Sequence, residues 1–424
     1  MEPLESTINT LKIRGSWGEL GNQNTKALYP YIQTMPFVAN DSKSHWLLSN
    51  SKFENTAASP ELISALLGWE TMRSWNIGFD LGMFNNRFNM SFDWFNRKTV
   101  NMVGPAPTLP AVLGADVPKT NNADLQSTGF ELDLSWRDRI DAVQYGVHVL
   151  LSDDRQKVLK YPNEKGLLST WRTGEYMGEI WGFETIGIAK SDQEMQDHLA
   201  SLPNGGQSEV GKNWAAGDIM YKDLDGDGTI HKGTTVDNPG DLKIIGNNTP
   251  RYKFGLDLDA SWKGFDIRVF LQGVLKRDYY IDGNMMFGAT GNRWQSGFFK
   301  SQMDFYRDAD DFWGENHDAY LPRPLFNDQN QKKQSRYLQN AAYCRLKNLQ
   351  IGYTIPARYT QKARISNLRI FFSAENLFTI TSLPDAFDPE TLGTGYGANW
   401  NDGTSTAKTH PLSQTFSTGL SVNF

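Results

Sequence analysis

Apolar and polar residues alternate along the segment 251–276 of the chain. Every second side chain is apolar from Tyr252 to Trp262, and again from Phe265 onward, on either side of a Lys-Gly pair. A period of two is that of a β-strand with one apolar face, and Lys-Gly suits a tight turn. The segment therefore predicts a long β-hairpin, whose apolar face must contact either a protein core or lipid.

About ten segments of the chain show this alternation. The expected strands lie near residues 11–17, 75–83, 88–94, 130–136, 143–151, 252–262, 265–275, 349–355, 368–372 and 416–424. Short polar turns alternate with long loops between them, and the longest loop covers residues 153–250. Strands of about ten residues can cross a bilayer when tilted, and this alternation of connections is typical of outer-membrane barrels. The pattern predicts an all-β fold, a transmembrane antiparallel β-barrel with long extracellular loops.

Closure limits how such a sheet can be completed. Lipid cannot satisfy an open strand edge, so a spanning sheet must close on itself. Ten strands could close alone as a small barrel, but the long loops and the early first strand favour part of a larger one. The opening residues MEPLESTINT have neither the basic nor the apolar region of a signal peptide. We therefore expect either an intracellular protein or a chain that lacks its true N-terminus.

Composition narrows the class of protein further. The 424 residues carry a net charge of −6 without a basic stripe, which gives no case for nucleic acid as a partner. Cys344 is the single cysteine, so an intrachain disulfide is excluded. No apolar run is long enough for a transmembrane helix. Aromatic residues make up 12% of the chain, which suits membrane-interface belts or a carbohydrate-binding surface.

Five blocks of sequence, in order along the chain, resemble the C-terminal part of a SusC/RagA-type TonB-linked outer-membrane transporter of Bacteroidetes. They are LKIRGSWGELGNQN at 11–24, the hairpin at 69–97, the TGFEL region at 122–136, GDIMYKDLDGDG at 217–228 with the hairpin after it, and NLRIFFSAENLFTIT at 367–381 with FDPE at 387–390. Asp124 and Ser127 depart from the family pattern, which usually has Gly and Asn there.

The resemblance implies a barrel of about 22 strands around a plug, of which residues 1–424 would form the last ten or so. The plug, the TonB-contacting segment, the signal peptide and the first strands would be missing from this chain. The full-length protein would import a large nutrient, a glycan oligosaccharide or a peptide, across the outer membrane, energised through TonB. Its partners would be outer-membrane lipid, a SusD-like lipoprotein and the barrel assembly machinery, with the terminal Phe424 as the assembly signal.

The best local motif for a metal lies in the long loop. Asp223, Asp225 and Asp227 occupy positions 1, 3 and 5 of an EF-hand-like loop, with Gly at position 6, and Thr229 could give its carbonyl at position 7. Thr234 stands at position 12, where a bidentate Glu is expected, and Asp237 further on is the candidate to replace it. We expect a structural Ca²⁺ site. The alternative is an Asp/Gly turn whose side chains cap their own backbone.

The sequence contains no recognisable catalytic motif. The six histidines are scattered, without HExxH, and neither GxSxG nor a phosphate-binding GxxxxGK[ST] occurs. We therefore expect a protein that is not an enzyme. Aromatic and polar clusters at 287–299, 305–313 and 396–400 could bind substrate, or pack loop on loop. The alternative functions are a soluble or surface-attached carbohydrate-binding β-protein and, with less support, a secreted glycosidase.

Overall fold

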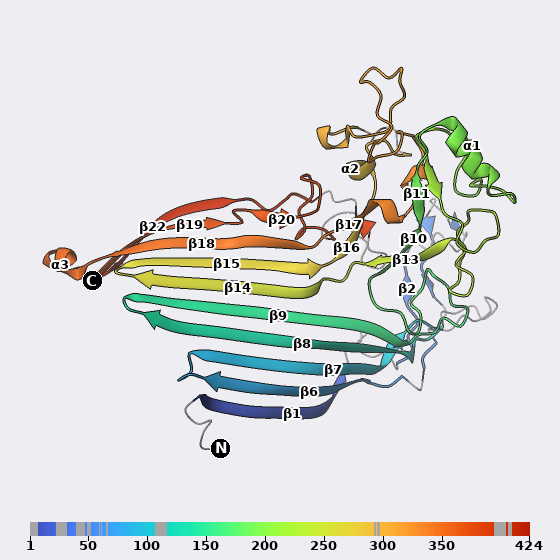
Figure 1. Ribbon diagram of the computed structural model, residues 1–424. Helices are drawn as coiled ribbons and strands as arrows, with labels where there is room; N and C mark the ends of the chain where they lie inside the picture. The colour runs from blue at the N-terminus through green and yellow to red at the C-terminus, as the bar shows by residue number, and fades with distance from the viewer. Residues whose placement is uncertain are drawn as a thin grey trace.

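One antiparallel sheet of ten strands dominates the fold (Figure 1). The computed structural model describes residues 7–22, 32–39, 47–48, 52–58, 60, 62–64, 67–106, 117–291, 294, 297–393, 404–405 and 409–424. The ten strands pair in chain order: β1 (Ile8–Asn22), β6 (Glu70–Met83), β7 (Phe88–Gly104), β8 (Thr120–Ile140), β9 (Val143–Lys160), β14 (Arg251–Trp262), β15 (Phe265–Lys276), β18 (Tyr343–Ile355), β19 (Asn367–Glu375) and β22 (Thr415–Asn423). A short strand, β20 (Thr379–Thr381), also pairs with β18. The predicted set of about ten antiparallel strands is confirmed, and in the described residues β1 and β22 form the two edges.

Residues that tolerate a left-handed backbone make the short turns. Asn85 and Asn86 have φ of 58° and 60° between β6 and β7, and Asp141 has φ of 50° between β8 and β9. Lys263 and Gly264, with φ of 46° and 91°, close the hairpin of β14 and β15. Two successive positive φ values match the right-handed twist of the flanking strands, so the turns fix the strand register. The connection from β18 to β19 is longer and carries α3 (Ala357–Thr360).

The two faces of the sheet differ in chemistry. On one face the alternating apolar side chains remain exposed; they include Leu11, Ile13, Trp17, Trp75, Ile77, Trp262, Phe265, Ile370, Phe416 and Leu420. On the other face lie charged pairs such as Asp133 with His148, 2.9 Å apart, and Asp257 with Arg268. A continuous exposed apolar face of this extent is unfavourable in water. The arrangement is that of a sheet between lipid and a polar lumen.

Most strands are longer than the alternation predicts, and β7, β8 and β9 exceed it most. β7, β8 and β9 contain 17, 21 and 18 residues, and β9 continues to Lys160, inside the segment expected to be loop. The sequence of this extension, DDRQKVLK, has no apolar alternation, although its backbone still pairs with β8, where Asp124 lies opposite Lys160. The apolar pattern ends where the strand leaves the lipid layer, whereas the hydrogen-bond ladder does not.

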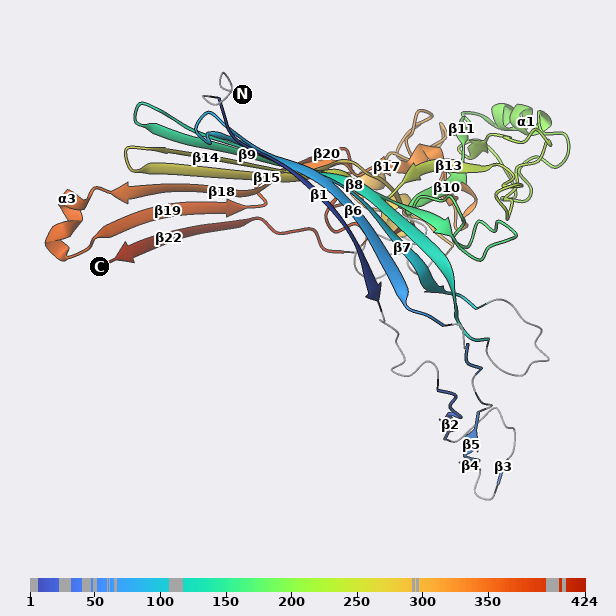
Figure 2. The same ribbon diagram turned by 90° about the horizontal axis from the view of Figure 1, so that it is seen from below.

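At one end of the strands the long connections fold into a compact region, which we name the loop domain and define as residues 161–250, 277–342 and 382–393 (Figures 1 and 2). Its elements are β10 (Glu179–Phe183), β11 (Thr185–Ile188), α1 (Asp192–Ala200), β12 (Ile219–Tyr221), β13 (Leu242–Asn247), β16 (Asp278–Ile281), α2 (Asn284–Phe287), β17 (Leu338–Asn340) and 3₁₀ turns at Lys300–Gln302, Gln329–Gln331 and Ser335–Tyr337. β21 (Thr404–Ser405) pairs with β16, on the side of β16 opposite β17. The β1–β6 connection holds β2 (Phe37–Val38), β3 (Leu47–Leu48), β4 (Lys52–Phe53) and β5 (Thr56–Ala57), and a last 3₁₀ turn covers Gln361–Ala363.

Aromatic and aliphatic side chains fill the core of the loop domain. Tyr221, Tyr280 and Tyr337 are fully buried, together with Ile219 and Ile281. The helix α1 begins at Ser191, whose hydroxyl accepts a hydrogen bond from the backbone N–H of Glu194 and so caps the first turn. No helix in the described ranges is long and apolar enough to cross a membrane.

Candidate functional site

The aspartate-rich loop lies in the loop domain between β12 and β13. Its turns depend on Gly226 and Gly228, which have φ of 77° and 79°. The carboxylate of Asp223 accepts hydrogen bonds from the backbone N–H of Gly226 at 2.6 Å and of Gly228 at 2.9 Å. Asp225 and Asp227 each accept a hydrogen bond from the N–H two residues further on, at 3.2 and 2.8 Å. The predicted capping of the backbone by its own aspartates is therefore present.

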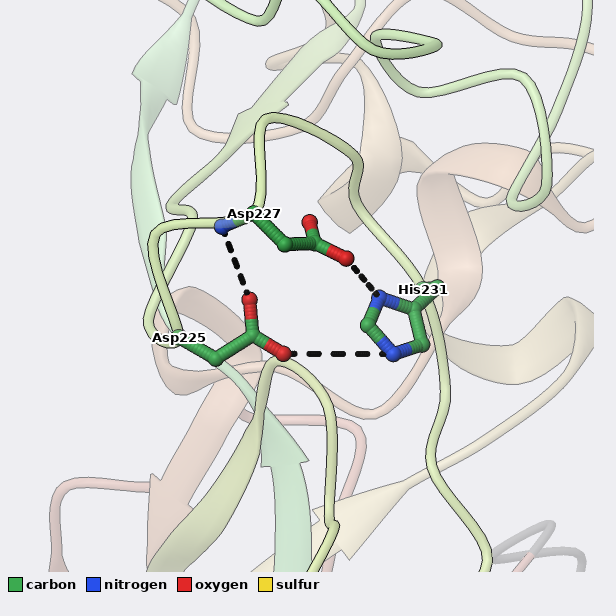
Figure 3. A group of neighbouring side chains, drawn as sticks. All are labelled: Asp225, Asp227 and His231. Atoms are coloured by element: carbon green, nitrogen blue, oxygen red, sulfur yellow. Dashed lines mark hydrogen bonds and ion pairs between the residues drawn. The ribbon is translucent and has the colours of Figure 1, made fainter.

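Two residues outside the motif complete the site. The carboxylate of Asp241, fully buried, accepts hydrogen bonds from the N–H groups of Leu224 and His231, both at 2.7 Å. The His231 ring lies between Asp225 and Asp227 (Figure 3), with nitrogen–oxygen distances of 3.9 and 3.6 Å. The ring is also 3.7 Å from Asp241. Four carboxylates and one imidazole thus converge on one small volume.

Electrostatics in this cluster favour positive charge. Burial acts to lower the pKa of His231, but the carbonyl of Thr229 and the carboxylates of Asp227, Asp225 and Asp241 outweigh it and raise the pKa. Burial raises the pKa of Asp241, the hydrogen bonds from Leu224 and His231 oppose that rise, and the charges of neighbouring aspartates add to it. A bound cation would relieve the repulsion among these carboxylates.

The donor atoms form two overlapping groups. Carboxylate oxygens of Asp223, Asp225 and Asp241 all lie within 4.8 Å of one another, and so do donor atoms of Asp225, Asp227 and His231. The first group offers only hard oxygen ligands, which suits Ca²⁺. The second includes an imidazole, a ligand that transition metals prefer. The residues therefore fit a divalent cation, and the ligand chemistry of the oxygen group fits Ca²⁺.

The predicted ligands occupy different places in this arrangement. Asp223, Asp225 and Asp227 lie together, while the carbonyl of Thr229 faces the His231 ring at 3.4 Å. Asp237 belongs to neither group, because the hairpin closed by Gly233 and Pro239 places it at an exposed tip. The same hairpin returns Asp241 to the start of the loop. Sequence spacing alone did not reveal Asp241, because a hairpin separates it in the chain from the groups it meets. His231 lies only two residues after Thr229, but an imidazole is not part of an EF-hand-like ligand pattern.

On the lumen face, charged pairs reach across intervening strands. Arg14 on β1 contacts Asp80 on β6 at 2.9 Å and also Asp93 on β7 at 2.9 and 2.8 Å. Gly78 lies beneath this contact, and a Cβ there would sit 2.3 Å from the Asp93 carboxylate. Glycine therefore leaves the space that lets one side chain bridge three strands.

A second glycine allows a similar contact on the lumen face near the other edge of the sheet. Arg369 on β19 reaches Asp266 on β15 at 2.9 Å across Gly352 on β18. A Cβ at Gly352 would sit 2.5 Å from the guanidinium of Arg369. Towards the short turns, Arg137, His148, Asp257 and other polar groups line an open cavity of about 1180 Å³. The lumen face is thus charged, and its groups are held in place by pairing.

The aromatic clusters proposed for substrate contact divide into two kinds. Phe287, Phe305 and Tyr306 are buried in the core of the loop domain, which confirms for them the alternative of loop-on-loop packing. Phe312 and Trp313 are instead 92% and 62% exposed at a hairpin tip. The cluster at 396–400 lies outside the described residues.

Comparisons with known proteins agree with the geometry. The family model for the TonB dependent receptor-like β-barrel matches residues 7–377. TonB-dependent receptor P3 of Formosa agariphila is 27% identical over 99% of this chain and 40% of its own length. TonB-dependent receptor SusC of Bacteroides thetaiotaomicron is 22% identical, again over 99% of this chain and 38% of its own length.

A solved structure supports the fold independently. The RagAB peptide transporter superposes with a TM-score of 0.68 at 20% identity, over 99% of this chain and 41% of that one. The chain spans about two fifths of the length of the relatives it matches. The expected SusC/RagA-type likeness, the outer-membrane location and the absence of enzymatic activity are confirmed at the level of the family. With the family model covering most of its residues, the chain belongs to the TonB dependent receptor-like β-barrel family.

Proposed function

We propose that the protein whose barrel wall this chain forms imports a large nutrient across the outer membrane, with energy supplied through TonB. The observation that carries the proposal is the two-faced sheet, apolar outside and charged inside, with a folded domain at the loop end of its strands. Such a wall encloses a polar passage through lipid, and the loop domain can contact cargo before it enters. This chain supplies the wall and the outer surface of that passage.

The cargo we propose is a peptide or a glycan oligosaccharide. Both are too large and too polar to cross a bilayer, and both can use the hydrogen-bonding and charged groups of the lumen face. A relative of similar fold is a peptide transporter by name, which favours the peptide. The exposed pair Phe312 and Trp313 favours neither, because aromatic rings stack on sugars and on apolar peptide side chains alike.

Uptake by living cells tests both the class of cargo and the dependence of import on energy. Cells that lack the gene for the full-length protein should fail to take up labelled oligopeptides or oligosaccharides of one class. Uptake of the corresponding monomers, which pass through porins, is the matched control and should not change. Collapsing the inner-membrane proton gradient should abolish the oligomer uptake in wild-type cells. Oligomer uptake that persists without the gene, or without the gradient, would overturn the proposal.

The proposed partners are a SusD-like lipoprotein above the loop domain, TonB, and the barrel assembly machinery. Phe424 follows β22 and is 90% exposed in line with the apolar face, which suits a terminal recognition signal. Isolation of the full-length protein from outer membranes should yield a lipoprotein in a 1:1 ratio, as a single complex. Phe424→Ala should lower the amount of barrel in the membrane, whereas Val422→Ala on the same face should not.

We also propose that the oxygen group of Asp223, Asp225 and Asp241 binds Ca²⁺ and so stabilises the loop domain. The short distances among the three carboxylates support this, with the backbone carbonyl of Thr229 and the side chain of Asp227 nearby. Ca²⁺ at about a hundred times its Kd would stabilise the folded domain by about 2–3 kcal/mol.

Thermal unfolding of the full-length protein in Ca²⁺ and in chelator tests the site. The shift in unfolding temperature should vanish in Asp223→Asn and Asp241→Asn. It should persist in the control Asp237→Asn, whose side chain lies at the exposed hairpin tip. A shift produced by Zn²⁺ and not by Ca²⁺ would move the site to Asp225, Asp227 and His231. No shift with either ion would overturn the site.

A further inference from the structure

A row of basic side chains crosses the outer face of the sheet near its loop end. The strand register places Glu19, Arg73, Lys98, Gln126 and Lys157 side by side on five neighbouring strands, from β1 to β9. Three of the five side chains are cationic. Neighbouring strands lie about 5 Å apart, so Arg73 and Lys98 are direct cross-strand neighbours.

This row belongs to the lipid-facing side of the sheet. Arg73 lies two residues from Trp75, and alternate residues of a strand point to the same face. Trp17 and Trp75 pair with each other in the adjacent row, with their rings 6.4 Å apart, and that row ends at Arg155 on β9. The basic row is therefore about 7 Å closer to the loop end than the interfacial tryptophans.

Carboxylates neutralise only part of this charge. Glu19 pairs with Arg73 at 2.5 Å, while Asp153 is buried against Arg251. Lys98 and Arg155 are exposed, and neither forms an ion pair within the described part of the chain, although the charge of Asp153 acts on Arg155.

An aromatic ring holds two of the cations in position. The Arg155 guanidinium lies 4.4 Å from the centre of the Tyr176 ring, and the Lys157 ammonium lies 5.4 Å from it. Tyr176 is held against β9 by backbone pairing with Lys157. The ring therefore fixes the cations without neutralising them.

We propose that Arg73, Lys98, Arg155 and Lys157 bind the phosphate groups of an anionic glycolipid in the outer leaflet. Adjacent like charges at a membrane interface repel each other unless an anion lies between them. At this height above the tryptophan belt, the anions available to the outer face are those of the lipid headgroups. The proposal depends on the outer-membrane location of the barrel and not on the cargo it carries.

The test compares retention of glycolipid by the full-length protein and by two triple variants. The row variant carries Arg73→Gln, Lys98→Gln and Lys157→Gln. The matched control carries Arg87→Gln, Arg137→Gln and Arg139→Gln, which remove the same charge at the opposite, short-turn end of the sheet. Each protein is incorporated into nanodiscs containing zwitterionic lipid and a few per cent of bis-phosphorylated lipid A, and the binding of lipid A is titrated.

The row variant should bind lipid A at least about tenfold more weakly than wild type, because each cation near an anionic surface contributes several-fold. The control variant should bind like wild type, and lipid A stripped of its phosphates should not distinguish the three proteins. Equal binding by row variant and wild type, or an equal loss with dephosphorylated lipid A, would overturn the proposal. If the row variant fails to fold, Lys98→Gln alone should still weaken the binding of lipid A measurably. Lys98 is exposed and makes no ion pair within the described residues, so this change should leave the fold intact.

Discussion

The sheet and the loop domain use the same large apolar residues in opposite ways. On the outer face of the sheet, Ile13 is 78% exposed and Leu420 is 68% exposed. In the loop domain, Tyr280, Ile281 and Tyr337 are completely buried. The buried hydrophobic cluster extends only from residue 183 to residue 392, with its members in the connections between the strands of the sheet.

The difference follows from the solvent that each region faces. Water drives the loop domain to bury its apolar side chains in a close-packed core. Lipid is as apolar as those side chains, so the outer face of the sheet needs no second layer, and the sheet is held together by its backbone ladder. Exposure of an apolar residue is therefore a structural requirement in one region and would be a defect in the other.

The largest effect is expected in the loop domain, where an ion pair with a fully buried carboxylate can be compared with an exposed pair. Asp218 in the loop domain is fully buried and accepts two hydrogen bonds of 2.6 Å from Arg323, with a further one from Asn330. Asp218→Ala would leave the Arg323 charge unpaired, so we expect the loop domain to lose about 3–5 kcal/mol of unfolding free energy. Hydrogen exchange of the β12 amides at increasing denaturant concentration measures this loss in the loop domain itself.

Asp318→Ala is the control for that experiment, because Asp318 pairs with Lys190 on the exposed surface. Its effect on stability should be close to the error of the measurement. A loss from Asp218→Ala no larger than that of the control would mean that the loop domain is not organised around this pair.

The second contrast is between the two faces of the sheet. Leu258 points outward and Ser135 points into the lumen, and they belong to neighbouring cross-strand rows. Leu258→Arg should cost about 2–4 kcal/mol of folding free energy in liposomes, because a charge near the bilayer midplane must be desolvated. Ser135→Arg should cost far less, since its charge enters a polar cavity. Equal costs at the two positions would refute the assignment of the faces.

The contrast between the regions also explains what the sequence could predict. The strands of the sheet follow from alternation because one face meets lipid at every second residue, so Tyr252 to Trp262 are predicted almost residue by residue. Where β9 leaves the lipid at Asp153, the alternation stops and the prediction ends too early. The order of strands follows from the alternating short and long connections.

The loop domain could not be predicted in this way. Its core joins residues such as Tyr221 and Tyr337, which are far apart in the sequence and lie in segments without regular periodicity. The metal site shows the same limit: the motif at 223–229 is local and visible, whereas Asp241 joins it only through a hairpin. The need for glycine at position 78 could not be predicted either, because it arises from the Asp93 side chain of a neighbouring strand.

A smaller effect is expected where glycine leaves space for a charge on the lumen face. In Gly78→Ala, the new Cβ would lie 2.3 Å from Asp93 and 2.7 Å from the Phe92 carbonyl, so the strand must shift, at a cost of about 1–3 kcal/mol. Gly255→Ala is the matched control, because its Cβ would meet nothing closer than 3.5 Å. Urea unfolding of the barrel in detergent measures both. If Gly255→Ala destabilises the barrel as much as Gly78→Ala, the close approach at Gly78 is not what requires glycine there.

The smallest predicted effect is a pH dependence confined to the loop domain. Burial lowers the pKa of His198 at the end of α1, against the opposing effect of its hydrogen bond with Gln207, 3.1 Å away. The unfolded chain therefore binds a proton at this site more readily than the folded one. The stability that neutral His198 contributes is present above its unfolded pKa of 6.5 and is lost as the pH falls towards the lower folded pKa. One group can change the unfolding free energy by at most about 1.4 kcal/mol per pH unit.

Hydrogen exchange of the α1 amides between pH 7.5 and 5.5 measures this effect in the region where it should act. As the pH is lowered, protection of the α1 amides should decrease more steeply in the wild type than in His198→Gln. The amides of β14 and β15 should show no such difference between the two proteins. Glu175 acts in the opposite direction, because burial raises its pKa and stabilises its neutral form as the pH falls. The difference between wild type and His198→Gln cancels that contribution, since Glu175 is present in both. Identical pH profiles for the two proteins would show that His198 is as readily protonated in the folded loop domain as in the unfolded chain.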